Sequence, residues 1–283
     1  MSLRNCLVVV FIALLSFCAL AQSPPPPVQQ PITIAQLSDT HLGEKRAPHA
    51  AENLRHAVDM INDRHPDAVI LSGDVGENPG EWEEAKSILA AVKAPLYYAP
   101  GNHDVHTKDV ERYREEFGKD YYEFHVKFAD FVVIDSELLG NYDVYESKTP
   151  SPLPPETEEE SEKMFSWLNG LQKKNREREV VIGVQHIPVF HDGDYPPDRK
   201  PYWIVSEPYR SREMDILKKL RIRDMLVGHW HNGRVFEREG ITWHVAPATS
   251  WLPWGGELGF AMHTITPDGD VHTEFIDLPG AKP

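Results

Sequence analysis

The sequence predicts an α/β fold organised around a parallel sheet, and two observations support this. Short apolar runs occur at 32–37, 68–71 and 95–99, and the first two contain β-branched residues, which is typical of buried strands. Between these runs, residues 48–65 and 78–92 place apolar side chains at helical spacing. Strands separated by helices are joined by crossover connections, which link parallel strands within one sheet.

The first helices have local start and stop signals. Pro66 ends the helix at 48–65 because proline cannot continue it. Asn78 is a good N-cap for the next helix, and Pro79 suits its first position. The third strand, 95–99, then ends at Pro100.

The alternation of helices and strands continues through the rest of the chain. Further helices are expected at 109–117, 156–178 and 214–220. Further strands are expected at 121–126, 131–135, 180–184, 225–227, 234–239, 242–246, 261–266 and 271–276. The last four alternate with turns and are interpreted as antiparallel strands. Residues 137–157 and 191–208 are expected to be long irregular segments, the first of them on the surface. Substrate specificity is expected to lie in residues 137–157 and 187–210.

Composition limits the class of protein. The 283 residues can bury an ample core, and residues 32–278 are predicted to form one domain. The formal net charge is −15, with acidic residues dispersed along the chain. Broad negative charge repels a phosphate backbone, so we expect no binding of nucleic-acid polymers. A small anionic substrate is compatible with this charge if a local cation attracts it.

Residues 1–21 resemble a signal peptide. Arg4 gives a positive start, residues 6–20 are nearly all apolar, and Ala21 ends a small-x-small cleavage pattern. As a membrane anchor, the apolar run would span roughly 22 Å as a helix, short of the ~30 Å hydrocarbon core. We therefore expect cleavage near Ala21, export to the periplasm or the medium, and no transmembrane segment in the mature chain.

A lipoprotein acylated at Cys18 is the weaker alternative, because a lipobox requires a small residue where Phe17 stands. Both cysteines of the chain lie within the signal, so the mature protein would contain none and would depend on its core for stability. Residues 22–31, which include four consecutive prolines, are expected to be a linker.

Polar side chains with metal-binding chemistry follow the predicted strands. After the third strand, residues 101–104 place an amide, an imidazole and a carboxylate side by side, and the carboxyl ends of parallel strands form the usual ligand crevice. The strand-end donors are Asp39, His41, Asp74, Asn102, His186, His229 and His231. Mixed nitrogen and oxygen donors without thiolate suit divalent Mn, Fe or Zn better than Ca or Mg.

Seven donors would over-supply a single ion. Two ions that share a carboxylate fit better, at the ~3.5–4 Å separation usual for two-metal hydrolases. Asp74 is the natural bridging ligand, because it stands alone on the middle one of the first three strands.

The ordered blocks Asp-x-His, Gly-Asp, Gly-Asn-His-Asp, His and Gly-His-x-His resemble those of the calcineurin-like metallophosphoesterase superfamily, from about residue 32 to residue 276. Residues 185–190 further resemble a subgroup with a protein-phosphatase-like member. The resemblance implies a four-layer α-β-β-α sandwich with two mixed sheets. It also implies a small phosphorylated substrate or a phosphoprotein.

The resemblance also implies a ligand set for each ion. One ion would be bound by Asp39, His41, Asp74 and His231, and the second by Asp74, Asn102, His186 and His229. Purple acid phosphatases, a sister group, have glycine and tyrosine where this chain has His41 and Glu77. A ferric ion bound by tyrosinate is therefore not expected.

The expected mechanism is attack by a metal-bridging hydroxide on phosphorus, with His103 as general acid and Asp104 as the residue that orients it. A phosphomonoesterase is favoured. The alternatives are a phosphodiesterase acting on nucleotides or lipid head groups, and a catalytically silent metal-binding module.

Further histidines, among them His244 and His263, are expected to be structural. Four tryptophans lie near the expected mouth of the site and either pack there or stack on a substrate's leaving group. These are Trp203, Trp230, Trp251 and Trp254.

Overall fold

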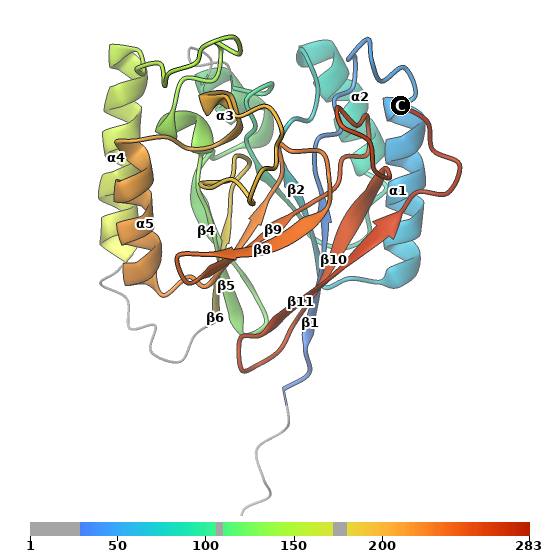
Figure 1. The fold of residues 1–283 in the computed structure, drawn as a ribbon. Helices are drawn as coiled ribbons and strands as arrows, with labels where there is room; N and C mark the ends of the chain where they lie inside the picture. Colours follow the sequence, from blue (N-terminus) through green and yellow to red (C-terminus); the bar gives the residue numbers. More distant parts are fainter. Residues whose placement is uncertain (1–28, 106–109, 172–179) are drawn as a thin grey trace, which may run out of the picture.

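The computed structural model describes residues 29–105, 110–171 and 180–283 (Figure 1). The predicted signal peptide and most of the linker lie outside the described residues. Among the described helices, none is long and apolar enough to cross a bilayer.

The first sheet has the strand order β11-β10-β1-β2-β3. Its strands are β1 (Ile32–Leu37), β2 (Ala68–Ser72), β3 (Leu96–Ala99), β10 (Gly259–Ile265) and β11 (Val271–Asp277). β1, β2 and β3 are parallel, as the crossover helices require, whereas β10 and β11 add antiparallel strands at the edge.

The second sheet has the order β4-β5-β6-β7-β9-β8. Its strands are β4 (Tyr122–Val126), β5 (Ala129–Val133), β6 (Val180–Val184), β7 (Asp224–Val227), β8 (Arg234–Arg238) and β9 (Ile241–Val245). β5, β6, β7 and β9 are parallel, and β4 and β8 are antiparallel edge strands. Both sheets are therefore mixed. The last four strands form the two expected antiparallel pairs, but each pair joins a different sheet.

Helices cover the outer face of each sheet. α1 (Ala50–Arg64) and α2 (Pro79–Leu89) lie beside the first sheet, and α4 (Pro155–Leu171) and α5 (Tyr209–Leu220) beside the second (Figure 1). α3 (Val110–Phe117) follows β3. Asn78 caps α2 as predicted, since its side chain accepts a hydrogen bond from the Gly80 N–H at 3.1 Å.

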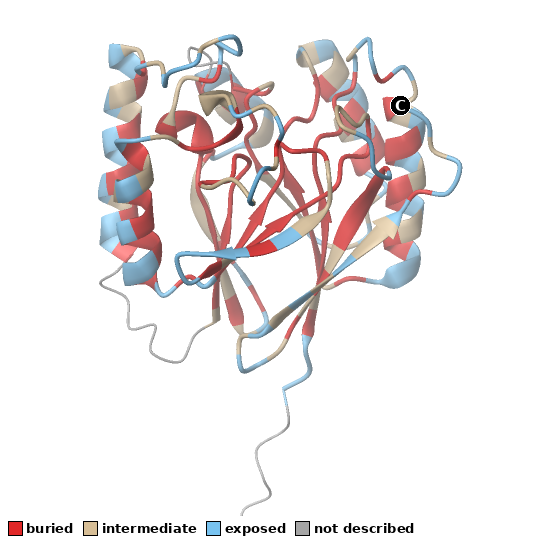
Figure 2. Ribbon diagram, viewed as in Figure 1, coloured by how far each residue is buried: buried red, intermediate tan, exposed pale blue. Residues whose placement is uncertain are grey.

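Three apolar layers hold the fold together, and they show the order in which the helices and the two sheets are stacked. One layer joins α1 and α2 to the first sheet, a second joins the two sheets, and a third joins the second sheet to α4 and α5. Figure 2 shows the buried faces of the helices turned toward the sheets. The predicted four-layer sandwich is therefore confirmed.

Among the described residues, most boundaries differ from the sequence prediction by at most three residues, and two differences are larger. α5 begins at Tyr209 rather than at Met214, because a charged stretch interrupts the apolar pattern while Tyr209 and Glu213 are both buried. The segment 137–157 does not begin on the surface. Residues Ser136–Leu139 form a buried 3₁₀ turn whose leucines pack against the core of the second sheet.

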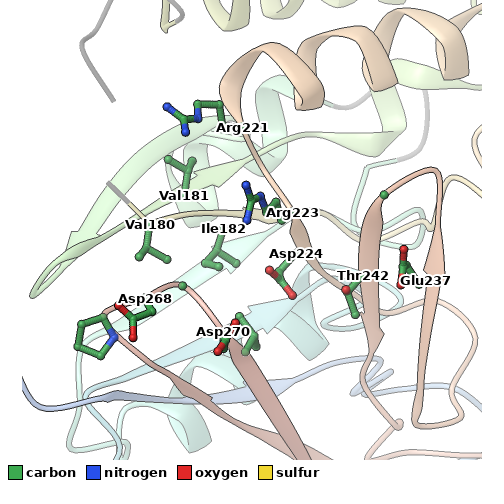
Figure 3. Close-up of a pocket in the computed structure, with 14 residues that line it drawn as sticks. Val180, Val181, Ile182, Arg221, Arg223, Asp224, Glu237, Thr242, Asp268 and Asp270 are labelled. Atoms are coloured by element: carbon green, nitrogen blue, oxygen red, sulfur yellow. The ribbon is translucent and has the colours of Figure 1, made fainter. Parts of the chain in front are cut away.

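Two of the histidines expected to be structural form a buried polar chain between the sheets. His263 bonds Gln36 Oε1 (2.9 Å) and the Thr273 hydroxyl (2.8 Å), which also bonds His244 (2.7 Å). His244 in turn pairs with Asp224 at 2.9 Å. Asp224 borders a cavity of about 600 Å³ at the amino ends of β6 and β7 (Figure 3). At the other end of this polar chain, Gln36 Nε2 donates to Ser72 Oγ (2.7 Å) and to the Val227 carbonyl (3.0 Å), next to the residues described below.

Candidate metal centre

The predicted site residues come together at one edge of the sandwich. Asp39 and His41 follow β1, Asp74 follows β2, and His186 follows β6. The remaining residues are Asn102, His103 and Asp104 after β3, and His229 and His231 after β7. Because the parallel strands of both sheets end at this edge, residues nearly 200 positions apart become neighbours. It is the upper edge as drawn in Figure 1.

The backbone of this edge is strained. Five of the seven candidate ligands have left-handed φ angles, which non-glycine residues rarely adopt. The values are Asp39 53°, His41 41°, Asp74 55°, His229 69° and His231 58°. Such conformations cost free energy and persist where packing fixes them, commonly at functional sites. The turns after β1, β2 and β7 thus aim these side chains at one point.

Two donor clusters lie side by side. The side chains of Asp39, His41 and His231 form one, with His231 Nε2 at 3.2 Å from Asp39 Oδ1. Asp74, His186 and His229 form the other. Asp74 Oδ2 lies 3.1 Å from His186 Nε2 and 3.4 Å from His41 Nε2, and therefore faces both clusters. This is the position that a bridging carboxylate requires.

Each of the four histidines has one ring nitrogen fixed by an acceptor that cannot donate. The acceptors are Glu77 Oε1 for His41 Nδ1 (2.9 Å), the Ser72 carbonyl for His186 Nδ1 (2.6 Å), the Tyr202 carbonyl for His229 Nε2 (2.9 Å) and the Trp251 carbonyl for His231 Nδ1 (2.8 Å). These bonds place the ring proton on the outer nitrogen. The inner nitrogen of each neutral ring then presents a lone pair, which is how metal-binding histidines are oriented.

The inner donors fit a pair of cations. Nε2 of His41 and Nε2 of His231 lie 3.2 Å apart, and two lone pairs at that distance repel unless a positive charge lies near them. Asp39 Oδ1, Asn102 Oδ1 and His186 Nε2 are buried without a hydrogen-bond partner among the described residues. Buried polar atoms without partners are costly, and metal coordination removes that cost.

Charge in the site also favours cations. Burial lowers the pKa of His186, yet the carboxylates of Asp74 and Asp39 outweigh it and raise that pKa to about 9. Burial would raise the pKa of Asp39, but the His231 and His186 imidazoles lower it to about 2. Negative charge that favours a proton on this buried imidazole in the absence of metal would also favour a cation beside it.

Asn102 and Asp104 have different surroundings. The amide nitrogen of Asn102 donates to the Tyr202 hydroxyl at 2.8 Å, which leaves its oxygen as the free donor atom. The Asp104 carboxylate accepts from the backbone N–H groups of Val75 (2.8 Å) and Gly101 (3.0 Å). The prediction that Asp104 orients the ring of His103 is therefore wrong: its carboxylate holds the turns after β2 and β3 together.

Glu77 takes the role predicted for Asp104. Its Oε2 accepts from His103 Nδ1 at 3.0 Å, while its Oε1 accepts from His41 Nδ1. Glu77 was not among the residues predicted for the site. The available signal was its place three residues after Asp74, where purple acid phosphatases have tyrosine. Because its carboxylate bonds both imidazoles, the proximity of these three side chains needs no third ion.

A pocket of about 500 Å³ opens over the two clusters. Its floor includes Asp74 and the imidazoles, and aromatic side chains form much of its wall. These are Tyr145, Tyr202, Trp203, Trp251 and Trp254. Three of the four tryptophans expected at the mouth therefore line the pocket, whereas Trp230 is fully buried in the core of the second sheet.

Comparison with known proteins identifies the family. A sequence model described as calcineurin-like phosphoesterase matches residues 32–233, which include every candidate ligand. The chain belongs to the calcineurin-like phosphoesterase family. The resemblance noted in the sequence is thereby confirmed, and the protein is a metal-dependent phosphoester hydrolase.

Similar members of the family differ in their reactions. Serine/threonine-protein phosphatase CPPED1 of Homo sapiens is 26% identical over 239 residues, covering 78% of this chain and 71% of that protein. A probable cyclic nucleotide phosphodiesterase of Rhodococcus erythropolis is 26% identical over 246 residues, covering 80% and 75%. The crystal structure of a dimetal phosphatase from Danio rerio shares the fold, with a TM-score of 0.65 at 15% identity over 88% of this chain and 97% of that one.

Replacing Gly101 by alanine should damage this phosphoesterase site. A Cβ at this position would lie 2.3 Å from Asp74 Oδ1 and 2.4 Å from its backbone nitrogen, so the carboxylate must move. We expect a loss of about 1–3 kcal/mol in the free energy of unfolding, as for other overpacked sites, together with weaker metal binding. Urea denaturation and metal analysis of the purified variant measure the two effects.

Gly170→Ala is the matched control. A Cβ there meets nothing within 4 Å, and alanine favours the helix by up to about 1 kcal/mol. If both alanine variants had the stability and metal content of the wild type, the close approach of Gly101 to Asp74 would not matter to the site.

Proposed function

We propose that this protein is a phosphomonoesterase that uses two divalent cations and His103 as general acid. The observation that carries the proposal is the pair of donor clusters that share Asp74, beside an imidazole held outside both of them. When bound, two such cations lower the pKa of water and offset the negative charge of the phosphoryl oxygens. Mn, Fe and Zn suit the mixed imidazole and carboxylate donors.

Residues of the chain supply the proton for the leaving group. Burial would lower the pKa of His103, but the carboxylates of Asp74 and Glu77 raise it to about 9, so the ring carries a proton on both nitrogens at neutral pH. Glu77 accepts from Nδ1, and the proton on Nε2 is left to be donated. His103 lines the pocket over the clusters, where the oxygen of the departing alcohol would lie. Protonation of that oxygen assists departure of a poor leaving group.

Phosphodiester hydrolysis is the second candidate, and a comparison favours it. A relative named as a probable cyclic nucleotide phosphodiesterase is as identical to this chain, at 26%, as the protein phosphatase is, and one named as a glycerophosphodiester phosphodiesterase is 32% identical over 38% of this chain. We favour monoesters because a monoester dianion carries more negative charge toward two cations than a diester monoanion does.

Parallel kinetics test the choice. The full chain is stripped with a chelator, reloaded with Mn²⁺, Fe²⁺ or Zn²⁺, and assayed with 4-nitrophenyl phosphate and bis(4-nitrophenyl) phosphate. We expect loss of activity on chelation, recovery on reloading, and a higher kcat/KM for the monoester. A higher value for the diester would favour the phosphodiesterase. No turnover despite bound metal would favour a silent binding module.

Export after cleavage near Ala21 is part of the proposal and is supported by the N-terminal sequence pattern. Mass spectrometry of protein recovered from the periplasm or medium of an expressing bacterium is expected to find Gln22 at the N-terminus. Retention of residues 1–21 in the cytoplasm would overturn it.

A further inference from the structure

One cation lies in the wall of the pocket over the metal centre. Among the described residues that line this pocket, Arg46 is the only arginine or lysine. In a chain of net charge −15, a positive group at that place is a local exception. It lies in the segment between His41 and α1, so it shares a short connection with one of the candidate ligands.

The Arg46 guanidinium is held on two sides. Its Nε and Nη2 donate to the two oxygens of Glu44 at 3.0 and 2.9 Å, and its plane lies over the Trp251 ring with 3.9 Å to the ring centre. Trp251 is itself attached to the candidate metal centre, since its backbone carbonyl accepts a hydrogen bond from His231 Nδ1. The side chain is 58% exposed, yet these contacts fix its position, and so little rotamer freedom remains to be lost on binding.

One edge of the guanidinium remains available. An arginine has two edges that can each bind an oxyanion through paired N–H groups. Glu44 occupies the edge formed by Nε and Nη2, and Nη1 makes no hydrogen bond within the described part of the chain. The edge formed by Nη1 and Nη2 can therefore bind a second anion.

Lys200 is a second cation near the wall of the pocket, since it lies over the ring of Tyr145, but its surroundings differ. The Lys200 ammonium pairs with Glu146 at 3.0 Å and Asp198 at 3.4 Å. Two carboxylates already neutralise it, and it does not line the pocket. Arg46 is the better anion ligand of the two.

The wall around Arg46 suits a flat ring. The rings of Tyr202, Trp203 and Trp254 form a continuous series, with centroids 4.8 and 4.7 Å apart. Aromatic faces stack on aromatic ligands.

We infer that the substrate is an aromatic phosphate ester whose ring carries a second anionic group, and that Arg46 is the specificity-determining residue that binds this group. The inference rests on the proposed phosphoesterase function and adds the chemistry of the leaving group to it. The inference places Arg46 against the leaving group, because the donor clusters on the pocket floor would bind the phosphoryl group; Arg46 would then act on the choice of substrate.

Matched substrates test the inference. The carboxyphenyl phosphates with the acid at the 3- or 4-position are compared with the corresponding carboxamides, which have the same shape without the charge. In the wild type we expect kcat/KM for the better acid to exceed that for its amide by about tenfold, the effect of one partly exposed charge-assisted hydrogen-bond pair. Arg46→Gln should abolish this preference, and Arg46→Lys should retain part of it.

Arg55→Gln is the control variant. Arg55 is an exposed arginine of α1 that pairs with Glu84 at 3.2 Å, outside the pocket. We expect it to keep the wild-type preference for the acid. Equal kcat/KM for acid and amide in the wild type, or an unchanged ratio in Arg46→Gln, would overturn the inference.

Calorimetry separates this inference from the proposed function. Titration with (4-carboxyphenyl)phosphonate and its carboxamide measures the same preference without turnover. We expect the acid to bind about tenfold more tightly to the wild type and equally to Arg46→Gln. A protein that hydrolyses no ester but shows this difference would refute the phosphoesterase and retain the role of Arg46. Hydrolysis of esters with no difference in binding would retain the phosphoesterase and refute the role of Arg46.

Discussion

Asp74→Asn is expected to lower kcat/KM by at least about 10³-fold and to reduce bound metal to less than two ions per chain. One oxygen of Asp74 faces both donor clusters, at 3.1 Å from His186 Nε2 and 3.4 Å from His41 Nε2. Asparagine has the same shape but lacks the negative charge that two neighbouring cations require between them. Two-metal stabilisation of the transition state supplies several kcal/mol, which corresponds to this loss in rate.

The measurements are metal content by elemental analysis and kinetics with 4-nitrophenyl phosphate under saturating Mn²⁺. Asp59→Asn removes the same charge from the exposed face of α1 and should behave as the wild type. Two ions per chain and wild-type kinetics in Asp74→Asn would show that Asp74 does not bridge. Circular dichroism confirms that both variants are folded.

The position of the site could be predicted because it depends on strand ends alone. Asp39, Asp74 and Asn102 each follow a run that the sequence predicts as a strand, and parallel strands present their carboxyl ends at one edge. His186 and the pair at His229 and His231 follow strands of the second sheet, yet the same rule brings them to that edge. Helical and strand periodicity therefore sufficed to gather seven donors.

The hydrogen bonds within the site could not be predicted in the same way. Asp104 is adjacent to His103 in the sequence, but a turn of the backbone directs its carboxylate toward the N–H groups of Val75 and Gly101. Glu77 reaches His103 from another strand end. Adjacent residues in a turn point in different directions, so sequence proximity does not establish a side-chain contact.

For substrate specificity, only some of the chain segments that line the pocket could be predicted from the sequence. The two long segments were expected to shape the pocket, and Tyr145, Tyr202 and Trp203 do come from them. The turn after His41 and the segment that contains Trp251 contribute as much, although neither is long. The position of Arg46 over Trp251 arises from a contact between residues about 200 positions apart, which one sequence without relatives does not reveal.

His103→Ala is expected to lower kcat by about 10²–10⁴-fold with an alkyl phosphate and far less with 4-nitrophenyl phosphate. An alkoxide is a poor leaving group and needs the proton of His103, whereas 4-nitrophenolate leaves without one. The metal content should stay at that of the wild type, because His103 bonds Glu77 and lies outside the two ligand clusters that share Asp74. Elemental analysis and kinetics with both substrates measure these effects.

Two further variants distinguish the general acid from a structural residue. Glu77→Gln keeps His103 but cannot fix its Nδ1 proton as a carboxylate does, so we expect a smaller loss with the same dependence on the leaving group. His125→Ala changes an exposed histidine of β4 that pairs with Asp130, and it should leave both rates unchanged. Equal losses with both substrates in His103→Ala would indicate a positioning role, since a proton donor matters only when the leaving oxygen requires a proton. A fall in bound metal would instead make His103 a ligand, with Glu77 and His41 as its partners in that site.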